Sequence, residues 1–169
     1  MTYNDVQLGF YQNKLETLVS NLQELNIHKS KLVMKINNVK QEHNKNDSKI
    51  KELETYINAI KRDYNDVWQE LTDIHKQRKV ELDDRMNGLD MYKIIRDNGY
   101  TDSDSKTIME AKSIVNSIKS LSKKTRKTGT ELYKLNLELT NTNSNIKQIE
   151  QSIDNVNLKI SIFSQQQLF

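Results

Sequence analysis

The chain has 169 residues, with no proline, no cysteine and only four glycines. Its 26 basic and 23 acidic residues leave a formal net charge of +3, which describes a mixed, solvated surface and favours no particular partner. With 35% hydrophobic and 29% charged residues there is too little apolar material for a large globular core, and the lack of cysteine excludes disulfides and thiolate metal sites.

The sequence carries no sign of membrane insertion or export. No stretch approaches the ~20 apolar residues that span a bilayer, and residues 1–10 lack the basic and apolar segments of a signal peptide. We therefore expect no membrane partner and a cytoplasmic location, or one within a virion or the host cytoplasm.

An apolar residue every three then four positions dominates the first half of the chain. A mean spacing of about 3.5 keeps one narrow stripe facing a partner helix, as in a coiled coil. The pattern predicts one helix over about 5–96. We call its stripe seam one, and it runs through Leu8, Tyr11, Leu15, Leu18, Leu22, Leu25, Lys29, Leu32, Ile36, Val39, His43, Asn46, Ile50, Leu53, Ile57, Ile60, Tyr64, Val67, Leu71 and Ile74.

An all-polar segment at 43–48 is the place where this helix could break. An extra turn there would give three helices that fold into a three-helix bundle. The apolar phase is the same before and after the segment, because Val39 and Ile50 keep register through His43 and Asn46. We favour the continuous helix and interpret the polar seam residues as positions that set register or oligomeric state.

A turn is predicted at about 97–104. Gly99 suits the left-handed conformation that ends many helices, and the side chains of 102–105 can cap a new helix. The second helix is expected over about 105–165. Its stripe, seam two, runs through Ala111, Ile114, Ile118, Leu121, Thr125, Thr128, Leu132, Leu135, Leu139, Thr142, Ile146, Ile149, Ile153, Val156, Ile160 and Phe163. Because a short turn makes the helices antiparallel neighbours, the sequence predicts an all-α protein, a single elongated domain formed by a long antiparallel coiled-coil hairpin.

The predicted turn also sets a register. With a turn near residue 100, opposed positions have numbers that sum to roughly 200, since both helices rise equally per residue. The second helix would then leave residues 1–34 as an overhang without a partner in the chain, and a continuous apolar stripe of this kind marks an interface. We therefore predict a homo-oligomer whose interface contains Leu8, Tyr11, Leu15, Leu18, Leu22, Leu25 and Leu32.

Basic residues gather where seam one loses its phase. Arg78 takes a seam position and the apolar series resumes out of phase at Leu82, a stutter that locally unwinds a coiled coil. In the predicted register two basic runs meet at this level and could contact the phosphates of a nucleic acid, although a solvated face is the plain alternative. The candidate contacts are Lys76, Arg78, Lys79, Lys123, Lys124, Arg126 and Lys127, with Lys119 beside them.

No catalytic pattern stands out. The chain has no glycine-rich phosphate loop and no His-Glu-X-X-His, and His28, His43 and His75 are too far apart along one helix to share a metal. We expect no enzyme, catalytic residue, cofactor, metal or small-molecule substrate. The sequence favours a structural or adaptor protein that scaffolds or docks other proteins in an assembly, for example in a phage or virus. The alternative is a nucleic-acid-binding hairpin that uses the basic residues at 76–79 and 119–127.

Overall fold

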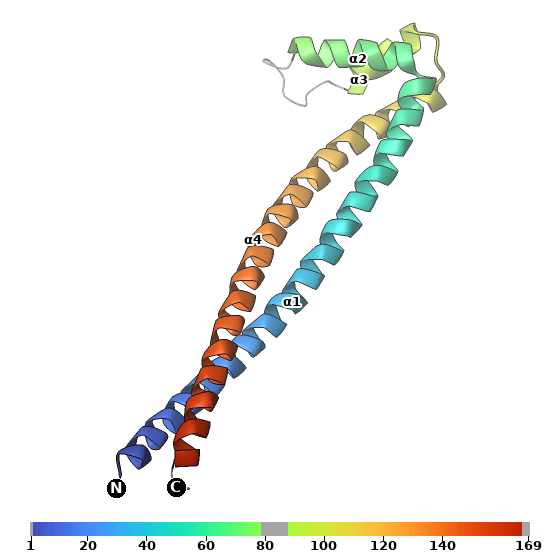
Figure 1. Cartoon of the computed structure of the whole chain (residues 1–169). Helices are drawn as coiled ribbons and strands as arrows, with labels where there is room; N and C mark the ends of the chain where they lie inside the picture. The colour runs from blue at the N-terminus through green and yellow to red at the C-terminus, as the bar shows by residue number, and fades with distance from the viewer. Residues whose placement is uncertain (1, 79–87, 167–169) are drawn as a thin grey trace. The chain divides into compact units, whose positions relative to one another are not determined.

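The computed structural model describes residues 2–78 and 88–166, and the side chains of 2–73, 91 and 93–166. The described residues form four helices and no strand: α1 (Tyr3–Asp63), α2 (Asn65–Arg78), α3 (Gly88–Asp97) and α4 (Asp102–Gln166) (Figure 1). Instead of the expected single domain, contacts divide the chain into two compact units. Unit 1 is Met1–Gln41 with Thr128–Phe169, and unit 2 is Glu42–Lys127.

In each unit α1 packs antiparallel against α4, which confirms the predicted all-α helical hairpin (Figure 1). Every position of seam one from Leu8 to Leu71, and every position of seam two, is buried or half-buried. In unit 1 the best-covered contact is a cluster of Leu32, Val39 and Leu135. Burying a leucine side chain stabilises a fold by about 1.5–3 kcal/mol, so the two seams account for the pairing of the helices. No helix among the described residues is long and apolar enough to cross a membrane.

The two long helices begin with the same capping arrangement. The backbone N–H of Asp5 donates to the Thr2 hydroxyl at 3.2 Å, while the Thr2 N–H donates to the Asp5 carboxylate at 2.9 Å. Thr101 and Asp104 repeat this exchange at the start of α4, at 3.2 and 3.1 Å. Such a box satisfies backbone donors that a helix N-terminus leaves unpaired. The cap of α4 is thus Thr101, one residue before the segment in which we expected it.

α1 passes through 43–48 without interruption. The three-helix alternative with an extra turn there is therefore wrong.

The expected first helix over about 5–96 is also wrong, because α1 ends at Asp63 and α2 begins at Asn65 (Figure 1). Asp63, Asn65 and Asp66 flank the break, and their short polar side chains compete with the helical backbone for hydrogen bonds. The break is a single residue: Tyr64 N donates to Ile60 O, and Tyr64 O accepts from Trp68 N, both at 2.9 Å. The apolar phase survives so short a break, and for this reason the sequence pattern did not reveal it.

The break changes the register of the hairpin. Tyr11 stacks on Phe163 with ring centroids 5.7 Å apart, and His28 Nε2 lies 3.0 Å from Glu138 Oε1. Opposed residues thus have numbers that sum to about 170 rather than roughly 200, since both helices rise equally per residue. The predicted overhang at 1–34 is wrong, because α4 extends alongside the first turns of α1.

The most completely buried side chains lie in unit 2, where α2 and α3 join the hairpin. Val67 and Leu71 from α2, Ile95 from α3 and Ile108 from α4 form one cluster, and each is at most 1% exposed. Tyr64, Met91, Ile94 and Tyr100 pack around it. We call these eight residues the head cluster.

The end of α3 follows the sequence expectation for Gly99. This glycine has φ 84°, in the left-handed region. The Gly99 N–H donates to Arg96 O at 2.9 Å and the Tyr100 N–H to Ile95 O at 3.3 Å. This pair of bonds is the Schellman ending of a helix, in which the residue after the glycine packs against the last turn. Tyr100 and Ile95 accordingly both belong to the head cluster.

We expect the substitution Ile108→Ala to lower the free energy of unfolding of unit 2 by about 2–5 kcal/mol, because it leaves a cavity in a fully enclosed site. Ile118→Ala, on the same helix and in the same unit, is the matched control and should cost less, since Ile118 is only half-buried. Urea unfolding followed by the fluorescence of Trp68, the single tryptophan, measures both losses. Equal losses would contradict the assignment of Ile108 to an enclosed core.

Candidate functional site

The residues predicted as an oligomer interface lie in unit 1 and are covered by α4. Leu32 is 5% exposed, and the other six (Leu8, Tyr11, Leu15, Leu18, Leu22 and Leu25) are half-buried. The reason given for this interface, an apolar stripe without a partner in the chain, is therefore wrong. The register observed within unit 1 supplies the physical cause, because α4 contributes Phe163 opposite Tyr11 and Glu138 opposite His28. Self-association itself stays a prediction.

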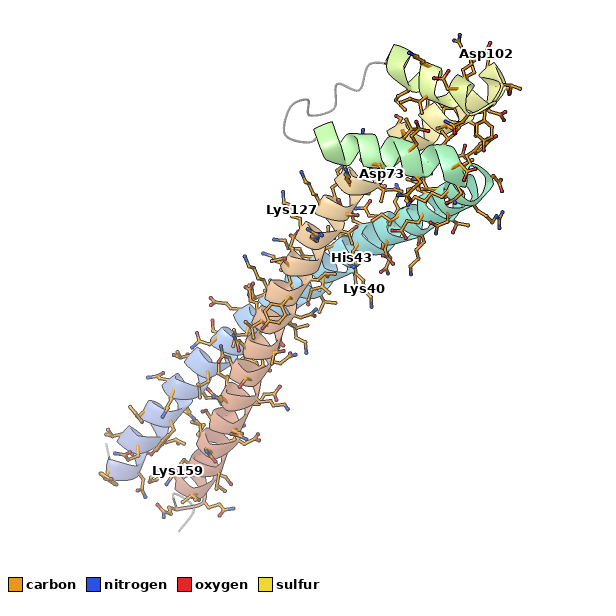
Figure 2. All side chains as sticks on the ribbon, turned by 90° about the horizontal axis from the view of Figure 1, so that it is seen from above. Lys40, His43, Asp73, Asp102, Lys127 and Lys159 are labelled. Atoms are coloured by element: carbon orange, nitrogen blue, oxygen red, sulfur yellow. The ribbon has the colours of Figure 1, made fainter. Side chains whose placement is uncertain are left out.

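The two predicted basic runs are not equally placed. The predicted basic residues on α4 all lie in unit 2, and their side chains are exposed. They are Lys119, Lys123, Lys124, Arg126 and Lys127, the last of which is labelled in Figure 2. Lys76 and Arg78 belong to α2, but their side chains lie outside the described residues, as does all of Lys79. In the observed register the α1 residues at the level of 119–127 are about 42–50. The expected meeting of the two runs relied on the other register and has lost that support.

A stretch of α4 that begins in unit 2 has an unusual charge composition. Residues 111–130 contain six basic residues and no acidic one. Ile114, Val115, Ile118 and Leu121 are half-buried and form the inner side of the helix. The exposed residues from 113 to 127 are only lysine, arginine, serine and asparagine. We call this set the α4 basic surface, and it consists of Ser113, Asn116, Ser117, Lys119, Ser120, Lys123, Lys124, Arg126 and Lys127.

The neighbouring part of α1 has a different charge pattern. There Lys51 lies 3.2 Å from Asp47, and Lys49 lies 3.7 Å from Glu52. Such exposed pairs are worth at most about 1 kcal/mol each, but they neutralise the helix surface. Within the described part of the chain, Lys112, Lys119, Lys123, Lys124 and Lys127 of α4 form no ion pair. No described carboxylate thus pairs with these five lysines, whereas Lys49 and Lys51 of α1 are paired.

Trp68 lies next to Lys112, the first basic residue of this run. Trp68 of α2 is 8% exposed and packs against Ile57, Ile60 and Ala111. The Lys112 ammonium lies 4.3 Å from the Trp68 ring centroid, and the Lys61 ammonium lies 5.6 Å from it. A cation over an indole face is attracted by the negative face of the ring. The Trp68 ring therefore lies close to the ammonium groups of two lysines from different helices.

Burial and two like charges act on Lys112. Desolvation by burial lowers the pKa of Lys112 below its ordinary value, and the like charges of Lys61 and Lys119 lower it further. A nearby carboxylate would raise this pKa, since it favours the charged amine, and none of the described carboxylates contributes to the shift. Three lysines of unit 2 therefore lie within electrostatic reach of one another.

A second polar contact joins the break in the first helix to the start of α4. Tyr64 Oη donates to Asp104 Oδ1 at 2.7 Å, and the Tyr64 and Tyr100 rings meet edge to face with centroids 5.2 Å apart. The hydrogen bond to the carboxylate raises the pKa of Tyr64 to about 12, with burial and the Asp104 charge adding to the effect. The bonds from Tyr64 and Thr101 lower the pKa of Asp104. Asp104 thus caps α4 and anchors Tyr64 at the same time.

The histidines are dispersed. His28 contacts Glu138 in unit 1, His43 is half-buried on seam one, and the side chain of His75 is outside the described residues. Among the residues that the structure describes, no group of three or more His, Cys, Asp or Glu could hold a metal ion.

Sequence reasoning did not single out Lys112, Lys61 or the Tyr64–Asp104 contact. The Thr-X-X-Asp pattern of 101–104 is a visible signal for the cap, and the absence of acidic residues from 111–130 is a visible signal for the charge. The cation contact with Trp68 depends on three helices meeting, which no local pattern indicates. Comparison of the chain with protein-family models, curated proteins and solved structures found no match.

The contact between Tyr64 and Asp104 predicts an alkaline titration. The raised pKa means that the bond stabilises the fold while the phenol is protonated, and that this contribution is lost as the pH rises through about 12. We expect the ultraviolet difference titration between the wild type and Tyr64→Phe to show a phenol with a midpoint near 12. A midpoint at the ordinary tyrosine value of about 10 would show that the bond is absent in solution. Tyr100→Phe, which removes a neighbouring phenol but leaves the bond, is the control.

Proposed function

We propose that the protein is a non-catalytic helical adaptor that docks or scaffolds other proteins in an assembly. The observation that carries this proposal is where apolar side chains reach solvent. Of the large apolar residues that are exposed in the described part of the chain, all but Tyr56 belong to unit 1. Contiguous exposed apolar residues on a soluble chain mark interaction sites, so unit 1 is the part that we expect partners to contact.

These residues lie outside both seams, so the pairing of α1 with α4 does not cover them. On α1, Ile27 is 58% and Met34 is 66% exposed, and their spacing of seven residues places them on one line of the helix. On α4, Tyr133 is 72% and Leu137 is 52% exposed, one turn apart. Apolar residues at such spacings can pack against a partner helix or insert into a groove.

A second copy of this chain is one form that the partner can take. The homo-oligomer predicted from seam one would then form through these outward residues, since the seam is already paired within the chain. Light scattering separates this form of docking from the binding of a different protein.

A second candidate function is binding of nucleic acid. It is favoured by the α4 basic surface alone, and no longer by a meeting of two basic runs.

The adaptor proposal predicts that Tyr133→Gln combined with Leu137→Gln removes bound partners without unfolding the protein. Glutamine is a good helix former, so circular dichroism should stay unchanged. The matched control is Lys134→Gln with Asn136→Gln, which alters exposed residues of the same turns and removes no apolar surface. We expect proteins that co-purify with the tagged wild type from its own cells to fall at least about tenfold with the first pair, equivalent to about 1.4 kcal/mol.

The control pair should retain the partners. Recovery of the same partners with both pairs, or of none with the wild type, would contradict docking through this face.

A further inference from the structure

We propose that the α4 basic surface, continued by Lys112 and Lys61 beside Trp68, binds the sugar–phosphate backbone of a nucleic acid. The inference rests on the second candidate function above and assigns it to a surface. All of the residues concerned lie in unit 2.

The chemistry of the exposed side chains favours phosphate over a protein partner. Phosphate oxygens accept hydrogen bonds from lysine and arginine, and also from serine and asparagine side chains. The exposed residues of 113–127 are of these four types and no others. A protein interface has an apolar core with aromatic or aliphatic anchors, and no apolar residue is exposed on this stretch. The surface is equipped for an anion that carries no apolar group to bury.

The spacing favours an extended anion over a single phosphate. Lys112, Lys119 and Arg126 are seven residues apart, so they lie along one line of α4 at intervals of about 10 Å. Lys123 and Lys127 lie on the same side of the helix, between and beside them. The line from residue 112 to residue 127 is about 22 Å long. Duplex DNA carries one negative charge per about 1.7 Å of its axis, and can meet four of these cations at once, Lys119 and Lys123 among them.

Among the described residues, no ion pair neutralises Lys112, Lys119, Lys123, Lys124 or Lys127. The ammonium groups of Lys61 and Lys112 lie over the same indole at 5.6 and 4.3 Å, and burial together with these like charges lowers the pKa of Lys112. On α1 of the same unit, lysines are instead paired with carboxylates. A bound polyanion would supply an opposite charge to the lysines of α4.

The same residues give no means of reading bases. The ring of Trp68 is 8% exposed and packs in the core, so it cannot stack on a base. Lysine and serine contacts to phosphate position a nucleic acid without reading its sequence. We therefore infer binding that depends on salt and not on sequence.

The test measures the affinity of the full chain for a mixed-sequence duplex by fluorescence polarisation between 50 and 200 mM salt. With four phosphate contacts the affinity should fall about 150-fold over this range. In the variant Lys119→Gln with Lys123→Gln two contacts remain, so the fall should be only about 12-fold. Lys147→Gln with Lys159→Gln removes the same charge from exposed positions of α4 in unit 1 and should behave as the wild type (Lys159 is labelled in Figure 2).

Trp68 provides a second, independent readout. Because Lys112 and Lys61 lie over its ring, a backbone that draws these ammonium groups away should change its emission. The emission change should saturate at the dissociation constant found by polarisation. A change of duplex sequence should leave that constant unaltered.

Each other outcome would contradict a specific element of this proposal. No binding by the wild type at tens of micromolar protein and 50 mM salt overturns both this surface and the second candidate function. Binding that is equally salt-dependent in the wild type and in Lys119→Gln with Lys123→Gln overturns the surface and leaves the function. Binding of a polyglutamate peptide as tight as that of the duplex, at equal salt, overturns nucleic acid in favour of an acidic protein.

Discussion

The contact between Tyr64 and Asp104 joins the residue that follows α1 to the first turn of α4. α1 and α4 are of nearly equal length, since α1 ends at Asp63 and α4 begins at Asp102. The first turns of α1 therefore find the last turns of α4 beside them, as the stacking of Tyr11 on Phe163 shows. A helix continued to about residue 96 would have left the N-terminal third without a partner. The hydrogen bond of 2.7 Å between Tyr64 and Asp104 links these two ends of the hairpin directly.

Much of the fold could be predicted from the sequence because burial imposes spacing. Each seam position from Leu8 to Leu71 is covered, and Gly99 has the positive φ that its place after a helix suggested. The end of α1 could not be predicted, since Tyr64 occupies a seam position and a break of one residue leaves Val67 and Leu71 in phase. An apolar residue is expected at these two positions whether they pack against α4 alone or also against α3. The sequence pattern therefore does not distinguish the head cluster from a continued seam. The basic run on α4 could be read from the sequence. The residues of α1 that lie opposite it could not, because they depend on the register of α1 against α4.

The number of helices around a side chain decides how completely water is excluded from it. In unit 2 a third and a fourth helix close over the hairpin, and Val67, Ile95 and Ile108 are fully buried. In unit 1 only α1 and α4 are present among the described residues, and Leu32 keeps 5% exposure and Val156 keeps 4%. Two helices bury one stripe each and leave their outer faces to solvent. The exposed apolar residues gather in unit 1, where the chain supplies no further helix to cover them.

The clustered positive charges of α4 lower the stability of this helix in the isolated chain. Like charges at a spacing of four residues, as at Lys119, Lys123 and Lys127, each destabilise a helix by about 0.2–0.5 kcal/mol. A helix surface selected for stability alone would alternate its charges, as α1 does where Lys51 meets Asp47 and Lys49 meets Glu52. The acid-free stretch does the reverse within a chain whose overall charge is only +3. In the complex that we propose, a bound polyanion would relieve this repulsion, so the residues that weaken the free helix would strengthen the complex.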